Sequence, residues 1–346
     1  MTMGSNPPDF AAWSLVARLL VVPQMGLLAM HLLQTSMVYV NTLTIQEVLA
    51  SPEWSEPMMP PRTNVGAPPR KEASMDPRHF EQELLQAVTA FVRQAPGNAM
   101  AAHDGMRMYD DPLLAVASAD DPWFARFPET QILGETFLQP QHWLAGCQSI
   151  IAYFLPFTQE LRATNKKPGL PSEAWVSARI DGEAFNQAVR TFLVDLLAQW
   201  GARACAPCLD PRFKVTARVA NWSERHVAMV AGLGTFGLHR ALITAKGSAG
   251  RLGSVVTTLA MPATPRPYTR HDEYCPSLNG GRCGACIRRC PPEAISSAGK
   301  NHALCSDYID REILPRFWPR YGCAKCNISV PCESGIPGTG RYAAGT

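Results

Sequence analysis

The strongest pattern of apolar and polar positions along the chain is helical. After the Asp-Pro pair at 76–77, a capping residue followed by proline, apolar side chains recur every three or four residues until the Pro-Gly pair at 96–97. A longer stretch with this spacing covers 172–200, and a short one covers 226–231. We expect three helices with apolar faces, and the face of the longest contains Phe185, Val189, Phe192, Leu196 and Leu197.

Short apolar runs predict strands between these helices. The run SIIAYFL at 149–155 ends at Pro156, which is typical of a buried strand. The run SVVTTLA at 254–260 is a second strand candidate. A further apolar run at 113–117 lies between two Asp-Asp-Pro turn signals. Helices that alternate with short strands predict an α/β or α+β core.

A separate apolar stretch lies near the N-terminus. Residues 19–40 contain no Asp, Glu, Lys or Arg and are long enough to cross a bilayer, although proline and polar residues interrupt them. The next basic residue is Arg62, so the positive-inside rule would place the rest of the chain outside the cytoplasm. A membrane anchor, a peripheral helix and an extension from an upstream start codon are the alternatives. We favour the extension, with Met75 as the start. Residues 1–74, including a Pro-rich linker at 51–73, are then expected to be poorly ordered and without stable membrane association.

Composition narrows the classes of protein that fit. The chain has 346 residues, 46% of them apolar and 18% charged, enough for two domains with cores of their own. The net charge of +3 is too small to indicate a nucleic-acid-binding protein by itself. From residue 261 onward, the chain has eleven Lys or Arg and seven Asp or Glu, an excess of positive charge. That excess suits an acidic electron donor, a phosphate backbone or an ordinary solvated surface, and we favour the last.

The cysteines carry the strongest chemical signal. Eleven are present, and eight of them fall between Cys275 and Cys332 in a large chain, which favours metal ligation in the reducing cytoplasm over a secreted disulfide framework. The run Cys283-x2-Cys286-x3-Cys290-Pro matches the last three ligand positions of a bacterial ferredoxin motif. Glycine occupies the usual first position, so we expect Cys275 to supply the missing ligand across a flexible loop.

The remaining cysteines form a second group with looser spacing, in which Cys332 follows Cys326 after five residues. In two-cluster ferredoxins the cysteine before the proline binds the other cluster, so we expect two [4Fe–4S] clusters with crossed ligands. The first set is Cys275, Cys283, Cys286 and Cys332, and the second set is Cys290, Cys305, Cys323 and Cys326. Structural zinc is the alternative. We favour clusters because Cys290-Pro is followed by Glu293-Ala294-Ile295, which predicts the short turn and helix of a ferredoxin half.

Two further motifs are weaker. Cys205-x2-Cys208 lacks a thioredoxin-like context, so we expect these two cysteines and Cys147 to be buried or incidental. The glycine loop at 232–237 matches G-x-G-x-x-G, but a helix-like run precedes it where a dinucleotide site needs a strand. NAD binding is therefore not expected.

The same loop resembles a known family. Glu224-Arg225-His226, the glycine loop, Gly247-Ser248 and the two cysteine groups follow one another as in the epoxyqueuosine reductases, and the resemblance covers about residues 80–337. It implies an α+β protein with a nitroreductase-like α/β core at 75–262 joined to a ferredoxin-like two-[4Fe–4S] domain at 263–346. It also implies a cobalamin-dependent oxidoreductase that removes the epoxide oxygen of a tRNA-borne queuosine precursor, with electrons from a low-potential ferredoxin or flavodoxin.

The resemblance nominates residues for corrinoid binding. These are Glu224, Arg225, Gly232, Gly234, Thr235 and Gly237. A tight turn would explain the glycines equally well, and Glu224 and Arg225 would fit a buried structural pair.

This chain departs from the family at three places. No acid stands at 218–223 where the family has its proton donor, Leu238 replaces a lysine, and residues 181–186 (DGEAFN) replace an Asp-Tyr-His element. No catalytic residue is therefore carried over. A ferredoxin-type electron-transfer or activator protein without catalysis is the alternative function.

Overall fold

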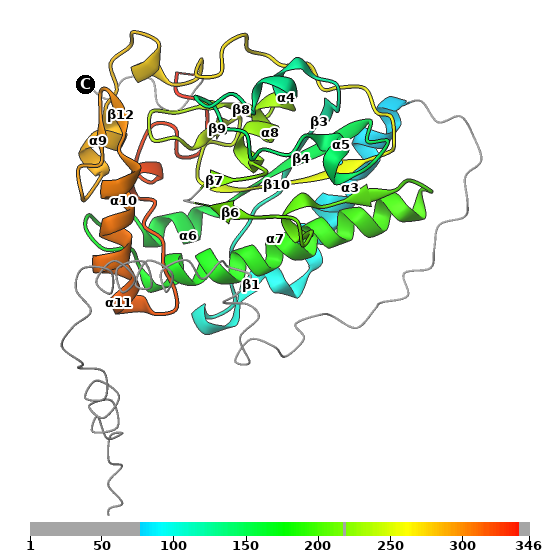
Figure 1. Ribbon diagram of the computed structural model, residues 1–346. Helices are drawn as coiled ribbons and strands as arrows, with labels where there is room; N and C mark the ends of the chain where they lie inside the picture. Colours follow the sequence, from blue (N-terminus) through cyan, green and yellow to red (C-terminus); the bar gives the residue numbers. More distant parts are fainter. Residues whose placement is uncertain (1–76, 217–218, 339–346) are drawn as a thin grey trace, which may run out of the picture. The chain divides into compact units, whose positions relative to one another are not determined.

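We describe residues 77–216 and 219–338 of a computed structural model, all of which belong to one compact unit (Figure 1). The apolar stretch at 19–40, the linker at 51–73 and the start proposed at Met75 lie outside the described residues. Within them, no helix is both long and apolar enough to cross a membrane. The domain boundaries expected after 74 and after 262 stay predictions.

A four-stranded antiparallel sheet forms the centre of the fold, in the order β3-β4-β10-β5. Every residue of β4 (Ser149–Pro156) is buried, because both faces of the strand are covered. Ile151 and Tyr153 face one hydrophobic cluster, and Ile150 and Phe154 face the other, as the two-residue period of a strand requires. The buried strand predicted at 149–155 is confirmed.

Helices cover both faces of this sheet, which makes the fold a three-layer α+β arrangement (Figure 1). Helices α3 (Pro77–Gln94) and α7 (Glu173–Gln199) pack on one face, and α8 (Glu224–Val230) packs on the other. All three predicted helices are confirmed. The predicted apolar face of α7 lies in the core or packs against it, and Leu193, which the prediction did not include, is fully buried there as well.

The other strands of the sheet follow the sequence pattern with shifted ends. The apolar run at 113–117 is the strand β3 (Leu113–Ser118). Strand β10 covers Gly250–Thr257, so it begins and ends earlier than the predicted run at 254–260. The edge strand β5 (Ala204–Cys205) contributes two residues.

Short elements connect these layers. Three two-stranded pairs lie beside the sheet: β1 (Ala99–Met100) with β2 (Met106–Arg107), β6 (Val215–Thr216) with β7 (Val219–Ala220), and β8 (Gly234–Phe236) with β9 (Leu242–Thr244). Short helices and turns complete the first part of the chain: α4 (Pro122–Arg126), α5 (Pro140–Trp143), α6 (Gln159–Thr164), η3 (Pro96–Asn98), η4 (Ala101–His103) and η5 (Pro207–Leu209).

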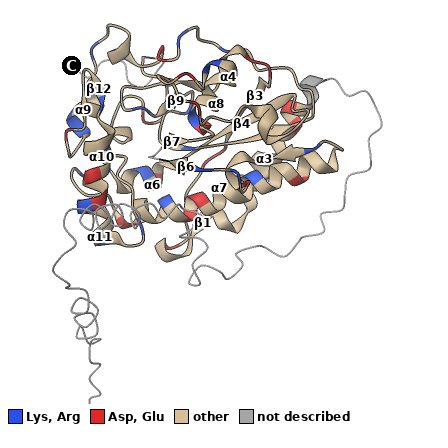
Figure 2. Ribbon diagram, in the orientation of Figure 1, with Lys and Arg blue, Asp and Glu red and all other residues tan. Residues whose placement is uncertain are grey.

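The cysteine-rich segment follows β10 and consists of short helical pieces. Its elements are η6 (Pro276–Leu278), α9 (Ala285–Arg289), β11 (Ile295–Ser296), β12 (Gly299–Lys300), α10 (His302–Tyr308), the π-helix η7 (Ile309–Ile313), α11 (Leu314–Phe317) and η8 (Lys325–Asn327). The helix predicted directly after Cys290-Pro is wrong. A turn with Glu293 in the left-handed region leads instead into the hairpin β11–β12. Charged residues of both signs lie along α7, whereas α9 carries basic residues (Figure 2).

A close seam joins the cysteine-rich segment to the sheet. The backbone N–H of Ser248 donates to the Cys332 carbonyl over 2.8 Å, and its hydroxyl donates to the same oxygen over 3.0 Å. Gly247 has a φ of +81°, and a Cβ atom there would lie 2.3 Å from the Glu333 carbonyl oxygen. Only glycine satisfies both conditions, so the Gly247-Ser248 pair of the sequence motif has a structural reason in this chain.

Candidate functional site

The first cysteine set surrounds one small, largely apolar cavity. Cys275, Cys283, Cys286 and Cys332 all line it, together with apolar side chains such as Ile243 and Val330. Cys275 and Cys332 come from opposite ends of the cysteine-rich segment, outside the regular ferredoxin spacing. They nevertheless line the same cavity as Cys286 of α9 and Cys283, which lies just before that helix. The structure therefore brings together all four residues that the crossed pattern assigned to one cluster.

Burial shapes the chemistry of these thiols. Burial, together with charge on the other cysteines of the first set, raises the pKa of Cys286 to about 11 and that of Cys332 to about 12. A set of thiols that cannot all ionise together in an apolar cavity needs a cationic centre to stabilise the thiolates. Binding of iron would displace the protons and remove this cost.

The second cysteine set also gathers in space. Burial, together with charge on Cys323, Cys305 and Cys290, raises the pKa of Cys326 to about 12. The thiol of Cys290 also accepts a hydrogen bond from the backbone N–H of Ala294 over 3.2 Å. These four cysteines come from α9, α10 and the loop around η8, and none of them contributes to the cavity of the first set.

Within 77–216 and 219–338, no group of three or more His, Cys, Asp or Glu side chains has the geometry of a site for a single metal ion. A cubane cluster distributes its four thiolates over four irons, so this finding does not test the cluster hypothesis.

A buried lysine lies inside the second set. Lys325 stands between Cys323 and Cys326 and is 1% exposed. Its ammonium group donates to the carbonyl and side-chain oxygens of Asn165, over 3.0 and 2.8 Å, and to the Lys167 carbonyl over 2.6 Å. All three acceptors are neutral. Burial lowers the pKa of Lys325 to about 8, and the neighbouring charge of Cys323 opposes that shift. Negative charge on Cys323 thus compensates in part for the burial of this cation.

A histidine that the sequence motifs did not predict lies at the first set. His239 is 3% exposed and lines the cavity, with its Nε2 atom 3.2 Å from Cys332 Sγ. Burial lowers its pKa to about 4, so the ring is neutral at ordinary pH. The only signal in the sequence was its place two residues after the last glycine of the glycine loop.

The residues nominated for corrinoid binding make contacts within the protein. The Glu224 carboxylate accepts hydrogen bonds from Ser254 over 2.5 Å, Cys208 over 3.1 Å and Arg190 over 3.4 Å. The Arg225 guanidinium donates to the Arg240 carbonyl over 2.5 Å. The two residues do not form the buried pair that the sequence suggested, since Glu224 pairs with Arg190.

The nominated loop residues are also explained by packing. A Cβ atom on Gly234 would lie 2.0 Å from the Ile243 carbonyl oxygen, across the β8–β9 pair. Gly232 has a φ of +99° and ends α8. Thr235 is fully buried, and its hydroxyl accepts a hydrogen bond from the backbone N–H of Tyr274.

A buried ion network occupies the region of residues 181–186, where the chain departs from the family pattern. Glu183 lies between Arg190, 2.8 Å away, and Arg251, 2.7 Å away, and Arg190 also reaches Glu224. Asn186 accepts a hydrogen bond from the Tyr153 hydroxyl over 2.8 Å. This stretch therefore holds α7 to the sheet.

The three cysteines outside the two sets are held as thiols. Burial raises the pKa of Cys147 and of Cys205 to about 11 in each case, and burial beside Glu224 raises that of Cys208 well above its ordinary value. Such thiols are poor nucleophiles at neutral pH.

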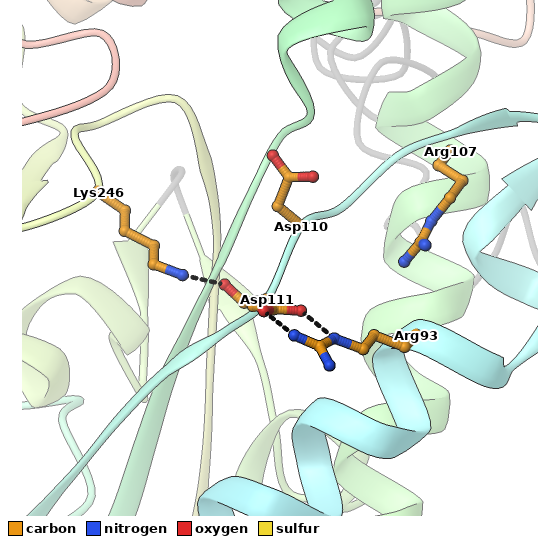
Figure 3. A pocket seen from close by; sticks show the side chains of 5 residues that line it. All are labelled: Arg93, Arg107, Asp110, Asp111 and Lys246. Carbon is orange, nitrogen blue, oxygen red and sulfur yellow. Dashed lines mark hydrogen bonds and ion pairs between the residues drawn. The ribbon is translucent and has the colours of Figure 1, made fainter.

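A second hollow on the protein is open and charged (Figure 3). Asp111 accepts two hydrogen bonds from Arg93, over 2.7 and 2.5 Å, while the Lys246 ammonium donates to the Asp111 carbonyl. Arg107 and Asp110 complete the lining. Arg93 and Asp111 form an ion pair, whereas Lys246 is held by a backbone carbonyl oxygen.

Fold and site together define an α+β protein with two gathered four-cysteine sets, and comparison with known proteins then points to one family. No family model matches the chain. Over 183 residues it is 29% identical to the epoxyqueuosine reductase of Vibrio cholerae, which covers 48% of this chain and 45% of that protein. Over 182 residues it is 28% identical to the enzyme of the same name from Pseudomonas aeruginosa, covering 49% and 47%. The chain thus spans about half the length of the curated relatives it matches.

A solved structure shows a looser likeness. A crystal structure of epoxyqueuosine reductase with an epoxyqueuosine-modified tRNA stem loop is 16% identical, covers 72% of this chain and 64% of that one, and has a TM-score of 0.43. No residue is carried over at this score. The resemblance that the sequence motifs indicated is confirmed by the curated relatives, and the chain is a divergent relative of the epoxyqueuosine reductases.

Proposed function

We propose that this protein is an iron–sulfur oxidoreductase related to the epoxyqueuosine reductases, with one [4Fe–4S] cluster in each cysteine set. The observation that carries the proposal is the position of Cys275 and Cys332 on the cavity that Cys283 and Cys286 also line. These two residues are the ones whose spacing departs from the ferredoxin pattern. Their meeting at one cavity is what four ligands of a single cubane require.

The residues present fit such clusters. Each set offers four thiols, the walls around the first set are largely apolar, and backbone N–H groups of Leu238 and Ala294 reach Cys275 and Cys290. Bound clusters would supply one-electron transfer. The protein's part is to hold the thiolates, exclude water and adjust the reduction potentials through hydrogen bonds and the buried charge of Lys325.

The proposal is tested by metal analysis of protein reconstituted without oxygen. We expect about eight irons and eight sulfides per chain, as two cubanes require, with the broad absorption of thiolate-bound iron. Zinc without acid-labile sulfide would contradict the proposal and favour structural zinc. Cobalt is measured in the same sample after incubation with a corrinoid and gel filtration.

Cobalamin binding, reduction of a tRNA-borne epoxide and a ferredoxin- or flavodoxin-type donor are part of the proposal because the family resemblance implies them. One observation favours the second candidate, an electron-transfer protein without catalysis: the residues nominated for the corrinoid are engaged in internal contacts. Retention of cobalt after gel filtration supports the enzyme, whereas clusters without cobalt support the electron-transfer protein.

Lys325 offers a test of the second set. We expect Lys325→Met to make the midpoint potential of the cluster in that set more negative, because loss of a buried positive charge disfavours the more negative reduced form. Redox titration followed by EPR spectroscopy measures both potentials. The matched control is Lys246→Met, which removes an ammonium group that binds the Asp111 carbonyl. Equal potentials in Lys325→Met and the unaltered protein would show that the charge of Lys325 does not affect the potential of this cluster.

A further inference from the structure

The glycine loop ends in a turn that reaches the first cysteine set. From the contacts of this turn we infer that His239 is a positioning residue for that set, which donates an N–H···S hydrogen bond to the Cys332 thiolate and raises the reduction potential of its cluster. The inference rests on the proposed clusters and assigns to this loop a role other than corrinoid binding.

The tautomer of His239 follows from its two ring contacts. Its Nδ1 atom accepts a hydrogen bond from the backbone N–H of Ala241 over 3.0 Å. A neutral imidazole carries one proton, so that proton is on Nε2. Nε2 lies 3.2 Å from Cys332 Sγ, within the range of a hydrogen bond to sulfur. The ring therefore points its single donor at the thiolate.

Gly237 explains why the ring can lie there. A Cβ atom on Gly237 would be 2.7 Å from Cε1 and 2.9 Å from Nε2 of His239. The last glycine of the motif thus leaves space for the imidazole. Hydrogen bonds from the Gly237 N–H to the Ala241 carbonyl and from the Arg240 N–H to the Gly237 carbonyl close the turn over 2.9 and 2.8 Å.

The same turn also reaches the other outlying cysteine. The backbone N–H of Leu238 donates to Cys275 Sγ over 3.4 Å. Leu238 and His239 are consecutive residues of one turn. They thus contact Cys275 and Cys332, the two cysteines whose sequence spacing is irregular. The β8–β9 pair on either side fixes the turn, and the loop therefore acts as a rigid support for two N–H···S contacts.

The effect on potential has a definite sign. A hydrogen bond to a thiolate stabilises the form of the cluster with more negative charge, which is the reduced form. His239 is 3% exposed, so water does not replace the donor readily when the ring is removed. Loss of the bond therefore shifts the equilibrium toward the oxidised cluster.

Three variants of the whole, cluster-loaded protein test the inference. His239→Phe removes the donor and is expected to lower the reduced-to-oxidised ratio of one cluster about tenfold at a fixed solution potential, as for a hydrogen bond to a charged acceptor. His239→Gln keeps an amide donor and should restore most of the ratio. Gly237→Ala keeps the histidine but displaces its ring, and should resemble His239→Phe. EPR-monitored redox titration measures all three.

Pulsed EPR on protein with ¹⁵N-labelled histidine adds an independent readout. The reduced cluster should show coupling to one histidine nitrogen and to the exchangeable proton on its Nε2 atom. Both should vanish in His239→Phe, whereas coupling to the amide proton of Leu238 should remain. The control is His226→Gln, which changes a half-buried histidine whose ring contacts Ser223, Phe127 and Phe236. It should leave both potentials and the histidine coupling unchanged.

The possible failures are distinct. Clusters present in full, with equal potentials in His239→Phe and the unaltered protein, would overturn the inference alone. Loss of one cluster in His239→Phe together with its retention in Cys332→Ala would make His239 a ligand, and would also overturn it. Absence of iron and sulfide from the unaltered protein would instead overturn the proposed function.

Discussion

Cys286→Ala and Cys290→Ala are expected to damage different clusters, although the two residues lie in one short segment around α9. Cys286 lines the cavity with Cys332, whereas Cys290 interacts with Cys323 and Cys326. Each variant should keep about half of the iron and sulfide, since a cubane that lacks one thiolate is lost or incomplete. Iron analysis and EPR spectra of the reduced variants measure the outcome.

The pairing of variants makes this prediction specific. Cys332→Ala should give the same EPR spectrum as Cys286→Ala, and Cys326→Ala the same as Cys290→Ala. Cys147→Ala is the control, because this buried thiol lies outside both sets, and it should keep all iron. The same EPR spectrum in Cys286→Ala and Cys290→Ala, which would mean that both variants lose the same cluster, would disprove the crossed arrangement.

Glu183→Ala is expected to lower the free energy of unfolding by about 3–5 kcal/mol, the cost of leaving buried charges without their partner. The substitution leaves Arg190, whose side chain is 3% exposed, and Arg251 facing each other. Urea unfolding of the cluster-loaded protein without oxygen measures the change. Asp111→Ala is the control. It breaks the exposed pair with Arg93 and should cost no more than about 1 kcal/mol.

The pH dependence of this difference gives a second check. Burial alone would raise the pKa of Glu183, but attraction to Arg190 and then to Arg251 outweighs it and lowers the pKa. The stabilisation is therefore fully present above the pKa of glutamate in the unfolded chain, about 4.3. It is lost as pH falls below that value toward the native pKa. A difference between Glu183→Ala and the unaltered protein that stays constant through acid pH would refute the assignment.

Much of the core was predictable because its signals are local. The helix that begins at Pro77 has a capping pair, a regular apolar face and a Pro-Gly stop, and the run at 149–155 has the length and β-branched content of a buried strand. The ends of β10 were less predictable. Gly250 at its start pairs with Pro156 of β4, and this partner decides where the strand begins.

The candidate site was predictable where the spacing of cysteines in the sequence follows the spacing of cluster ligands in ferredoxins. Cysteine spacing alone placed Cys332 with Cys286, because ferredoxin ligands cross in a regular way. It did not identify His239, since the role of this residue depends on a turn that brings it to a cysteine far along the sequence. The helix wrongly expected after Cys290-Pro has a similar cause: Ile295 pairs with Lys300 in a hairpin, and the ferredoxin pattern does not encode that pairing.

Lys325 also links the cysteines to the sheet-bearing part of the protein. Its ammonium group reaches Asn165 and Lys167, in the connection between α6 and α7, and the Asn165 side chain in turn donates to the Cys323 carbonyl. Loss of the cluster from the second set would leave protonated thiols there, because burial raises the pKa of Cys323 and Cys326, and would remove the negative charge that balances this cation. The lysine would then gain from moving toward water, and the α6–α7 connection would lose three hydrogen bonds at once. Loss of this cluster would thus loosen the α6–α7 connection, which lies outside the metal ligands themselves.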